Sequence, residues 1–302
     1  MKFNYQFPSR AVQRWEQWSE GHQLAELAVA AEEAGFDMVS STDHPYPDAA
    51  WLKAGGHQDF ELFTTLAFMA AHTSRVRLLT NVMIAGYRNP YLAARAAATL
   101  DSMSGGRLTL GMGAGYLKPE FDVLGASFAD RGQRFDAAIG AMRNAWRGDV
   151  ADYGDAFFPA HGAIMTPTPK QKPGPPIWIG GNGKAAQRRA ATLGQGWMPF
   201  EQSPEMAAIT RTPALGSLEE IAAAIEGMKQ LRAERENREP FDVCFAPTGA
   251  RDSEGHVEHL AARIADYEAA GITWLTYDGR ARSWSDCLRE IARMGALIRG
   301  SR

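Results

Sequence analysis

The chain has 302 residues, of which 45% are hydrophobic, and a formal net charge of −3 at pH 7. This length could hold two domains, but barrels of alternating strands and helices commonly reach about 250 residues or more as one unit. The near-neutral charge gives no reason to expect nucleic acid or an anionic membrane as a partner.

The N-terminal segment MKFNYQFPSR lacks the apolar core of a secretory signal, and no apolar run is long enough to span a bilayer. Of the two cysteines, Cys244 falls in an expected strand and Cys287 in an expected helix. Both are therefore predicted to be small buried hydrophobes in a reducing compartment. We expect a soluble cytoplasmic protein of enzyme size.

Short β-branched or aromatic runs alternate with amphipathic helices along the whole chain. Eight such runs begin at Phe3, Met38, Val76, Leu108, Ile177, Trp197, Val243 and Thr273. This alternation implies parallel strands joined by helical crossovers, and eight units are what a closed barrel requires. The sequence thus predicts an α/β fold in which residues 1–302 form a single (β/α)8 TIM barrel with insertion segments at its C-terminal face.

Apolar residues that recur every three or four positions place the helices. The first four are expected at His22–Ala34, Glu61–His72, Pro90–Met103 and Arg131–Trp146, and later ones begin near Lys184, Leu218, Glu254 and Trp284. Three Ala-rich helix ends are followed by Gly35, Gly194 and Gly271, where glycine can take the left-handed conformation that closes a helix.

Two stretches interrupt the alternation. The segment from Gly148 to Pro176 is rich in proline and glycine and has no helical period, which is typical of a functional insertion. We predict that it excludes water from the active site as a lid. The region from Phe200 to Ser217 follows the sixth strand and is a second candidate for covering that site.

Asp43 and His44 come directly after the second strand, at the end of the barrel where catalytic groups are found. Histidine exchanges protons most readily near neutral pH, so His44 is a candidate acid or base. The alternative is that Asp43 only binds loop amides while His44 packs under Pro45.

Glycine-rich turns follow two further strands. Gly113 and Gly115, with Tyr116 beside them, would let backbone approach a flat or phosphorylated ligand, and a tight turn at the barrel rim is the alternative. Glu120 follows in a segment, residues 117–124, that could fold over the site.

The second glycine-rich turn precedes an expected helix. Gly180, Gly181 and Asn182 would present backbone N–H groups and the positive end of the helix dipole, an arrangement that suits a phosphate. Positive charge from Lys184, Arg188 and Arg189 lies close by in sequence. A simple strand-to-helix turn is the alternative.

Metal and nucleophile motifs are absent from the sequence. The seven histidines are scattered, and neither a His-x-His, a His-Glu-x-x-His nor a Gly-x-Ser-x-Gly pattern occurs. A barrel with glycine-rich turns but neither of these motifs suggests that an organic cofactor supplies the chemistry.

Three stretches together resemble the bacterial luciferase-like superfamily, and within it the oxidoreductases that use the deazaflavin coenzyme F420. They are AEEAGFDMVSSTDH, RVRLLTNVMIAGYRNPYLAARAAATLDSMSGGRLTLGMGAGYLKPEFDVLG and PPIWIGGNGKAAQRRAATLGQGW. The resemblance covers most of the chain from Leu24 to Pro199 and weakens beyond. It implies a (β/α)8 barrel with the flavin or deazaflavin ring at the C-terminal mouth.

The resemblance also implies roles for single residues. Asp43 and His44 match the pair near the ring, with His44 as proton donor or acceptor, and Glu120 falls near an acidic position of some relatives. Thr80, Asn81 and Val82 match a third-strand segment where relatives often carry a cis peptide, here predicted between Asn81 and Val82.

The remaining matches concern the cofactor and the substrate. Gly113, Gly115 and Tyr116 match the turn beside the cofactor, and Gly180, Gly181 and Asn182 match the phosphate loop. Substrate choice is expected to rest on loop aromatics, with Trp51, Tyr87, Tyr116 and Phe200 as candidates, although these side chains could equally belong to the core. Trp178 and Trp197 are expected to pack the barrel.

The resemblance predicts a hydride transfer between F420 and a small organic substrate. Deazaflavin has carbon where flavin has nitrogen, so it passes hydride and does not activate oxygen. Two alternatives remain: an FMN-dependent luciferase-like monooxygenase, and a non-catalytic barrel that binds flavin or deazaflavin. Relatives often dimerise, so a homodimer is one expectation, although no sequence feature requires it.

Overall fold

The computed structural model describes residues 1–8, 20–202, 207–208, 212–247, 253–279, 281 and 283–300. Eight parallel strands close a barrel in the order β1-β10-β9-β8-β7-β4-β3-β2. Their bounds are β1 Lys2–Gln6, β2 Met38–Ser41, β3 Arg77–Ile84, β4 Leu108–Gly113, β7 Ile177–Gly180, β8 Gly196–Met198, β9 Asp242–Phe245 and β10 Trp274–Asp278. The predicted (β/α)8 barrel is confirmed, and each predicted strand start lies within one residue of the observed one.

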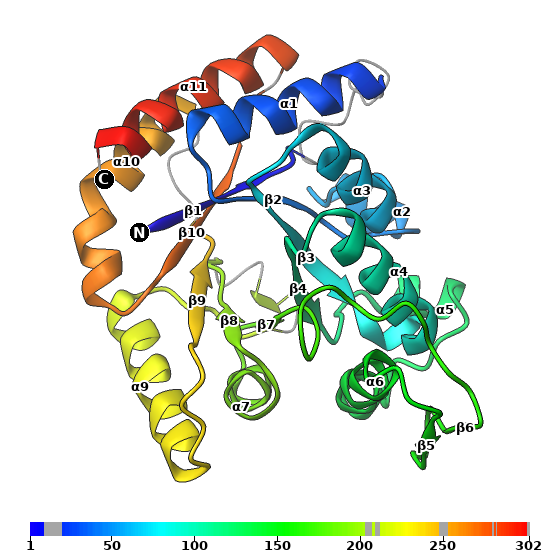
Figure 1. Cartoon of the computed structure of the whole chain (residues 1–302). Helices are drawn as coiled ribbons and strands as arrows, with labels where there is room; N and C mark the ends of the chain where they lie inside the picture. The colour runs from blue at the N-terminus through cyan, green and yellow to red at the C-terminus, as the bar shows by residue number, and fades with distance from the viewer. Residues whose placement is uncertain are drawn as a thin grey trace.

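The helices surround this barrel, and the two ends of the chain lie on the same side of it (Figure 1). Their bounds are α1 Gly21–Ala34, α2 Ala49–Lys53, α3 Leu62–His72, α4 Pro90–Met103, α5 Lys118–Val123, α6 Arg131–Trp146, α7 Lys184–Leu193, α9 Leu218–Glu234, α10 Ser253–Ala269 and α11 Trp284–Gly300, with a 3-10 turn, η2, at Ala85–Tyr87. The periodicity missed only short helices among those described, α2 and α5, because one or two turns are too short to show a repeat. Within the described part of the chain, no helix is long and apolar enough to cross a membrane.

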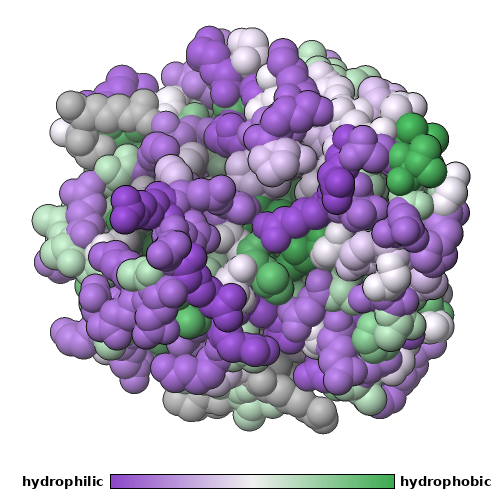
Figure 2. Space-filling model, turned by 60° about the horizontal axis from the view of Figure 1, so that its bottom comes forward, coloured by the Kyte–Doolittle hydropathy of each residue, from purple (hydrophilic) through white to green (hydrophobic). Residues whose placement is uncertain are grey.

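Two layers of buried side chains hold the barrel together. An inner cluster fills the barrel and consists of Met38, Leu79, Trp178, Met198, Cys244 and Trp274. The larger outer cluster lies between strands and helices and includes Trp197, so the packing role predicted for both tryptophans is confirmed. The outer surface on the face shown in Figure 2 is largely polar, with apolar side chains gathered in a central hollow.

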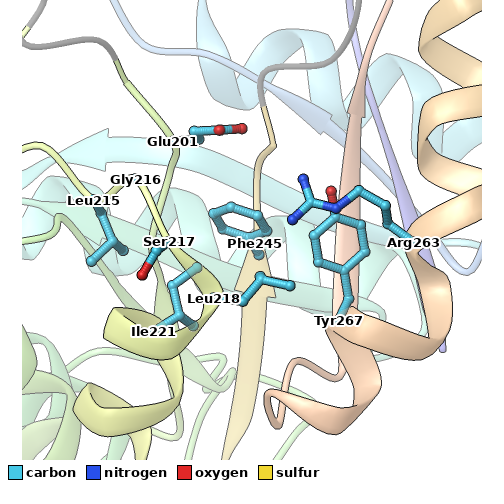
Figure 3. A pocket seen from close by; sticks show the side chains of 9 residues that line it. All are labelled: Glu201, Leu215, Gly216, Ser217, Leu218, Ile221, Phe245, Arg263 and Tyr267. Atoms are coloured by element: carbon cyan, nitrogen blue, oxygen red, sulfur yellow. The ribbon is translucent and has the colours of Figure 1, made fainter.

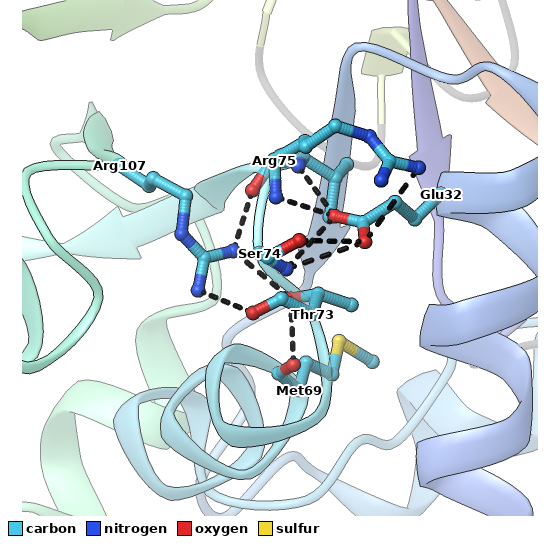
Figure 4. Close-up of polar contacts among 7 residues, drawn as sticks. Glu32, Met69, Thr73, Ser74, Arg75 and Arg107 are labelled. Atoms are coloured by element: carbon cyan, nitrogen blue, oxygen red, sulfur yellow. Dashed lines mark hydrogen bonds and ion pairs between the residues drawn. The ribbon is translucent and has the colours of Figure 1, made fainter.

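The N-terminal face of the barrel is fastened by charged side chains that bind backbone. Glu32, on α1, accepts hydrogen bonds from the N–H groups of Ser74, Arg75 and Val76, in the loop that leads into β3 (Figure 4). Arg107 donates to the carbonyls of Ala70, Thr73 and Val76. Each such charge-assisted bond is stronger than a neutral one, so this network holds α1, α3, β3 and β4 together on the side opposite the C-terminal ends of the strands.

The predicted lid lies at this N-terminal face, and that prediction was wrong. The segment between α6 and β7 carries a two-stranded hairpin, β5 Asp152–Tyr153 and β6 Ala160–His161, which stands outside α6 (Figure 1). Further on, Gln171 binds the Asp101 carboxylate and the Leu108 carbonyl at the start of β4. A segment that joins a helix to the next strand reaches the N-terminal ends of the strands, so it cannot cover the opposite mouth.

The three predicted helix-closing glycines behave differently. Gly35 and Gly271 have φ values of 98° and 88°, in the left-handed region as predicted. Gly194 instead has φ −107° and ψ 167°, which is extended backbone. A Cβ on Gly194 would lie 3.1 Å from the carbonyl oxygens of Ala190 and Ile177, so glycine is needed here for close packing and not for a left-handed turn.

Candidate active site

His44 and Glu120 lie against each other at the C-terminal mouth of the barrel. His44 follows β2, Glu120 belongs to α5, and their side chains are 8% and 2% exposed. His44 Nδ1 is 3.1 Å from Glu120 Oε2, while Glu120 Oε1 accepts the N–H of Tyr46 at 3.0 Å. An ionised Glu120 carboxylate can only accept, and in that state it would bind the Nδ1–H of His44 and leave Nε2 to exchange a proton.

An aromatic cluster surrounds His44. Its ring lies 4.6 Å from Trp51, 4.9 Å from His57 and 6.0 Å from Tyr116, measured between ring centroids. Trp51 is buried on α2, a helix that Asp48 caps by accepting from the N–H groups of Ala50 and Trp51. Two of the predicted substrate-contacting aromatics, Trp51 and Tyr116, are therefore brought to the candidate proton-transfer residue.

Asp43 has a different set of partners, Arg88 and the backbone of Ile84. Its carboxylate, 3% exposed, receives two hydrogen bonds from the Arg88 guanidinium, at 2.5 and 2.7 Å, and one from the N–H of Ile84 at 2.9 Å. Burial raises the pKa of Asp43, and Arg88 opposes that rise. Asp43 thus fastens the loop after β2 to the end of β3 and sets the position of the next residue, His44. No motif in the sequence pointed to Arg88.

Tyr87 belongs to the same anchoring region. Its hydroxyl donates to the Asp43 carbonyl at 3.4 Å, and its ring packs edge-on against Phe121 at 5.1 Å. Burial raises the pKa of this phenol well above its usual value. Of the predicted substrate-contacting aromatics, Tyr87 is therefore a packing residue.

A bulge in β3 shapes the floor of the mouth. The Asn81–Val82 peptide is cis, as predicted, and the pairing of β3 with β4 shifts between Thr80 and Met83. The Asn81 side chain donates to Gln6 Oε1 at 2.6 Å, and the buried Thr80 hydroxyl donates to the Gly111 carbonyl at 2.7 Å.

Gly113 and Gly180 make room for this bulge. A Cβ at Gly113 would lie 2.9 Å from Val82 Cγ2, and one at Gly180 would lie 3.0 Å from Val82 Cγ1. Gly115, with φ 83°, is crowded in the same way by Phe121 and Ile84. The glycines that the sequence marked as cofactor contacts therefore also serve packing, because only residues without a side chain fit beside Val82.

The predicted phosphate loop lies between β7 and α7. Gly181 has φ 120°, which disfavours other residues. The Asn182 side chain forms its hydrogen bonds within the protein: it donates to the carbonyls of Phe200 and Pro213 and accepts a hydrogen bond from the N–H of Phe200. Its amide therefore secures the chain after β8, and any phosphate would have to be bound by the backbone N–H groups at the start of α7.

The cations expected near this loop are not equally available. Arg189 pairs with Asp136 at 2.5 Å and also donates to the Gly132 carbonyl. Lys184 and Arg188 are exposed on α7. Part of the region predicted from Phe200 to Ser217 lies outside the described residues, and in its described part Gln202 donates to the Thr212 and Pro213 carbonyls.

A cleft with a volume of about 510 Å³ opens beside His44, large enough for a small molecule. It is lined by His44, Pro45, Tyr46, Pro47, Asp48, Ala49, Gln58, Asp59, Pro119 and Val123. Asp59 accepts from the Ser41 and Thr42 hydroxyls and from the Thr42 and Phe60 N–H groups, yet burial raises its pKa to about 6. No sequence motif pointed to Asp59.

A second hollow lies between the start of α9 and α10, where Glu201, Phe245, Arg263 and Tyr267 are among the lining residues (Figure 3). Its volume is only about 10 Å³, which is the space of a single water molecule. The cleft beside His44 is thus the better candidate for a substrate. Among the residues described, no cluster of His, Cys, Asp or Glu could hold a metal ion.

Comparison with known proteins shows the relationship of this chain to others. A family model described as luciferase-like monooxygenase matches residues 1–253. An F420-dependent glucose-6-phosphate dehydrogenase from Gordonia bronchialis is 36% identical over 184 residues, which are 58% of this chain and 52% of that protein. An uncharacterized protein from Mycobacterium tuberculosis is 31% identical over 229 residues, covering 72% of this chain and 74% of that protein. The chain thus spans about half the length of the curated F420-dependent relative.

Solved structures of low sequence identity share the fold. The monooxygenase RslO1 from Streptomyces bottropensis superposes with a TM-score of 0.80 at 20% identity and covers 100% of this chain and 99% of its own. The coenzyme F420 dependent tetrahydromethanopterin reductase from Methanopyrus kandleri gives a TM-score of 0.74 at 15% identity, with 99% of each chain covered.

Proposed function

The chain belongs to the luciferase-like monooxygenase family, and we propose that within it this protein is an oxidoreductase that uses coenzyme F420 to transfer a hydride to or from a small organic molecule. The observation that carries the proposal is the buried His44–Glu120 pair, which opens onto a cleft at the catalytic end of the barrel. The 36% identity to an F420-dependent dehydrogenase supports the choice of F420 over FMN. When bound, the deazaflavin ring supplies a carbon that accepts or gives up hydride.

The residues at the mouth fit a flat ring. Gly113 and Gly180 keep the space beside the Val82 bulge free of side chains, so backbone forms the floor. Deeper in the barrel, the buried side-chain amide oxygen Oδ1 of Asn4 has no hydrogen-bond partner among the described residues, and an unpaired buried acceptor favours a polar ligand nearby. We assign Thr80–Val82, Gly113, Gly115 and Tyr116 to the ring.

The phosphate of the coenzyme is assigned to the loop from Gly180 to Asn182 and the first turn of α7. Backbone N–H groups and the helix dipole supply the attraction, because the Asn182 side chain is already bonded. Lys184 and Arg188 add positive charge on the exposed side of α7, which suits an acidic coenzyme tail.

Glu120 holds His44 so that its Nε2 can take up or release the proton that accompanies hydride transfer. Asp43 acts through position, since its carboxylate is committed to Arg88. General acid–base catalysis of this kind contributes about 10²–10⁴-fold in rate.

The test measures turnover and F420 affinity of the variant His44→Ala, with His72→Ala as the matched control. His72 lies on α3 and binds the Phe68 carbonyl, away from the cleft. We expect His44→Ala to lose about 10²–10⁴-fold in turnover while F420 affinity changes little, and His72→Ala to retain both. Unchanged turnover in His44→Ala would exclude the role of His44. Binding of FMN in preference to F420, with oxygen consumed by the reduced flavin, would contradict the proposed function.

A further inference from the structure

The cleft beside His44 is poor in hydrogen-bond donors. Three of its lining residues, Pro45, Pro47 and Pro119, have no backbone N–H at all. The N–H of Tyr46, which stands between two of these prolines, already donates to Glu120. This part of the wall therefore offers a ligand carbonyl oxygens and apolar surface but few donors.

The charged side chains of the cleft are acidic. Asp48 and Asp59 line it, and the carboxylate of Glu120 lies behind His44. Carboxylates accept hydrogen bonds and repel other anions. Among the described lining residues there is neither a lysine nor an arginine.

Three of the described cations near the cleft in sequence have partners outside its lining, and a fourth, Lys53, is exposed on α2 and is not among the lining residues. Arg88 is bonded to Asp43, and Lys118 pairs with Asp122 at 2.6 Å. Arg131 donates to the carbonyls of Gly115 and Phe128. Among the described lining residues, a phosphate group in the cleft would thus meet the carboxylates of Asp48 and Asp59 and neither a lysine nor an arginine. Cations and sets of backbone donors are the groups that bind phosphates.

Resting on the proposed function, the geometry points to the substrate class: an uncharged hydroxyl or carbonyl compound, and not a phosphate ester such as the substrate named for the Gordonia relative. A substrate hydroxyl can donate to the acceptor-rich wall. On oxidation of an alcohol, the carbon-bound hydrogen leaves as hydride to the deazaflavin, the hydroxyl proton passes to His44, and a carbonyl forms. The reverse reaction uses the reduced coenzyme and returns the proton from His44.

The experiment compares alcohols with their phosphate esters on the F420-loaded protein. Glucose with glucose 6-phosphate, and 1,2-propanediol with its 1-phosphate, are offered while deazaflavin absorbance is followed. We expect kcat/KM for the uncharged member to exceed that for the ester by at least about tenfold. A preference for the phosphate ester in either pair would overturn the inference.

Charge variants at Gln58 test the same cleft without altering the residues assigned to catalysis. Gln58 is exposed and lines the cleft. Gln58→Lys should lower the ratio of kcat/KM for the uncharged member to that for its phosphate ester several-fold. Gln58→Glu should leave this ratio unchanged or raise it. The same preference in both variants would show that substrates do not pass through this cleft and would overturn the inference.

If none of the compounds is turned over, the inference is tested by measuring the binding of inorganic phosphate to the F420-saturated protein. We expect saturable phosphate binding only in Gln58→Lys. Saturable binding to the unaltered protein that Gln58→Glu weakens would overturn the inference. Failure to bind F420 at all is a different result, because it contradicts the proposed function.

Discussion

Replacing Arg88 with methionine should destabilise the protein strongly, because it leaves the Asp43 carboxylate buried without its counter-charge. Arg88 provides two of the three hydrogen bonds to this carboxylate, and only the N–H of Ile84 would remain. With charges about 4 Å apart and an effective dielectric constant of about 20, the lost attraction is about 4 kcal/mol. Breaking a buried pair by removing one partner typically costs about 3–5 kcal/mol, so we expect a loss of that size in the free energy of unfolding.

The loss in the free energy of unfolding that Arg88→Met causes should become smaller as the pH falls. Burial raises the pKa of Asp43 even in the intact pair, and Arg88 opposes this rise. Without Arg88 the folded state binds the proton on Asp43 more tightly than the unfolded state does. The difference between variant and parent is therefore largest at neutral pH and shrinks on acidification through the raised folded-state pKa.

Urea unfolding of Arg88→Met, measured from neutral pH down to about pH 5, checks both statements. Lys118→Met is the matched control: its ion pair with Asp122 is more than half exposed on both sides, and its loss should cost no more than about 1 kcal/mol. The reasoning is refuted if Arg88→Met costs no more than this control, or if its cost is the same at both ends of the pH range.

Three further outcomes are expected. Glu32→Gln should lower the free energy of unfolding by about 1–3 kcal/mol. The backbone N–H donors of residues 74–76 lower the pKa of the Glu32 carboxyl below its usual value, although burial acts to raise it. The ionised carboxylate is therefore stabilised in the folded state. This stabilisation is present above the unfolded-state pKa and is lost as pH falls through the folded-state value, so the variant and the parent should converge in acid unfolding. Gly113→Ala should cost about 1–3 kcal/mol by overpacking against Val82, and Val82→Ala in the same chain should recover part of this in thermal unfolding; no recovery would contradict the packing role. Because burial raises the pKa of both cysteine thiols to about 12, neither should react with a thiol reagent until the protein is unfolded, and rapid reaction of the native protein would show that the thiols are accessible.

Much of the fold could be read from the sequence because local physics sets it. Helices such as Pro90–Met103 and Arg131–Trp146 were predicted to the residue, since their apolar period is long and Asn89 and Pro90 mark the start of the first of them. The resemblance placed the cis peptide at Asn81–Val82, and the structure confirms it.

Tertiary structure alone decided what the site residues contact. Asp43 and Asn182 have side chains that could have faced a ligand, but each is bonded to groups from distant parts of the chain, Arg88 for one and Phe200 and Pro213 for the other. Glu120 meets His44 across 76 residues of sequence, and no local pattern encodes that approach.

The sequence by itself determined the alternation of strands and helices, the positions of the glycine turns and the absence of metal and nucleophile motifs. These are properties of a residue and its near neighbours, which periodicity and residue type reveal. Three other features depend on the closing of the barrel. They are the pairing of carboxylates with cations, the choice of glycines that make room for Val82, and the face on which the segment from Gly148 to Pro176 lies. Closure brings together side chains far apart in the chain, and only then does burial decide which polar groups remain available for chemistry.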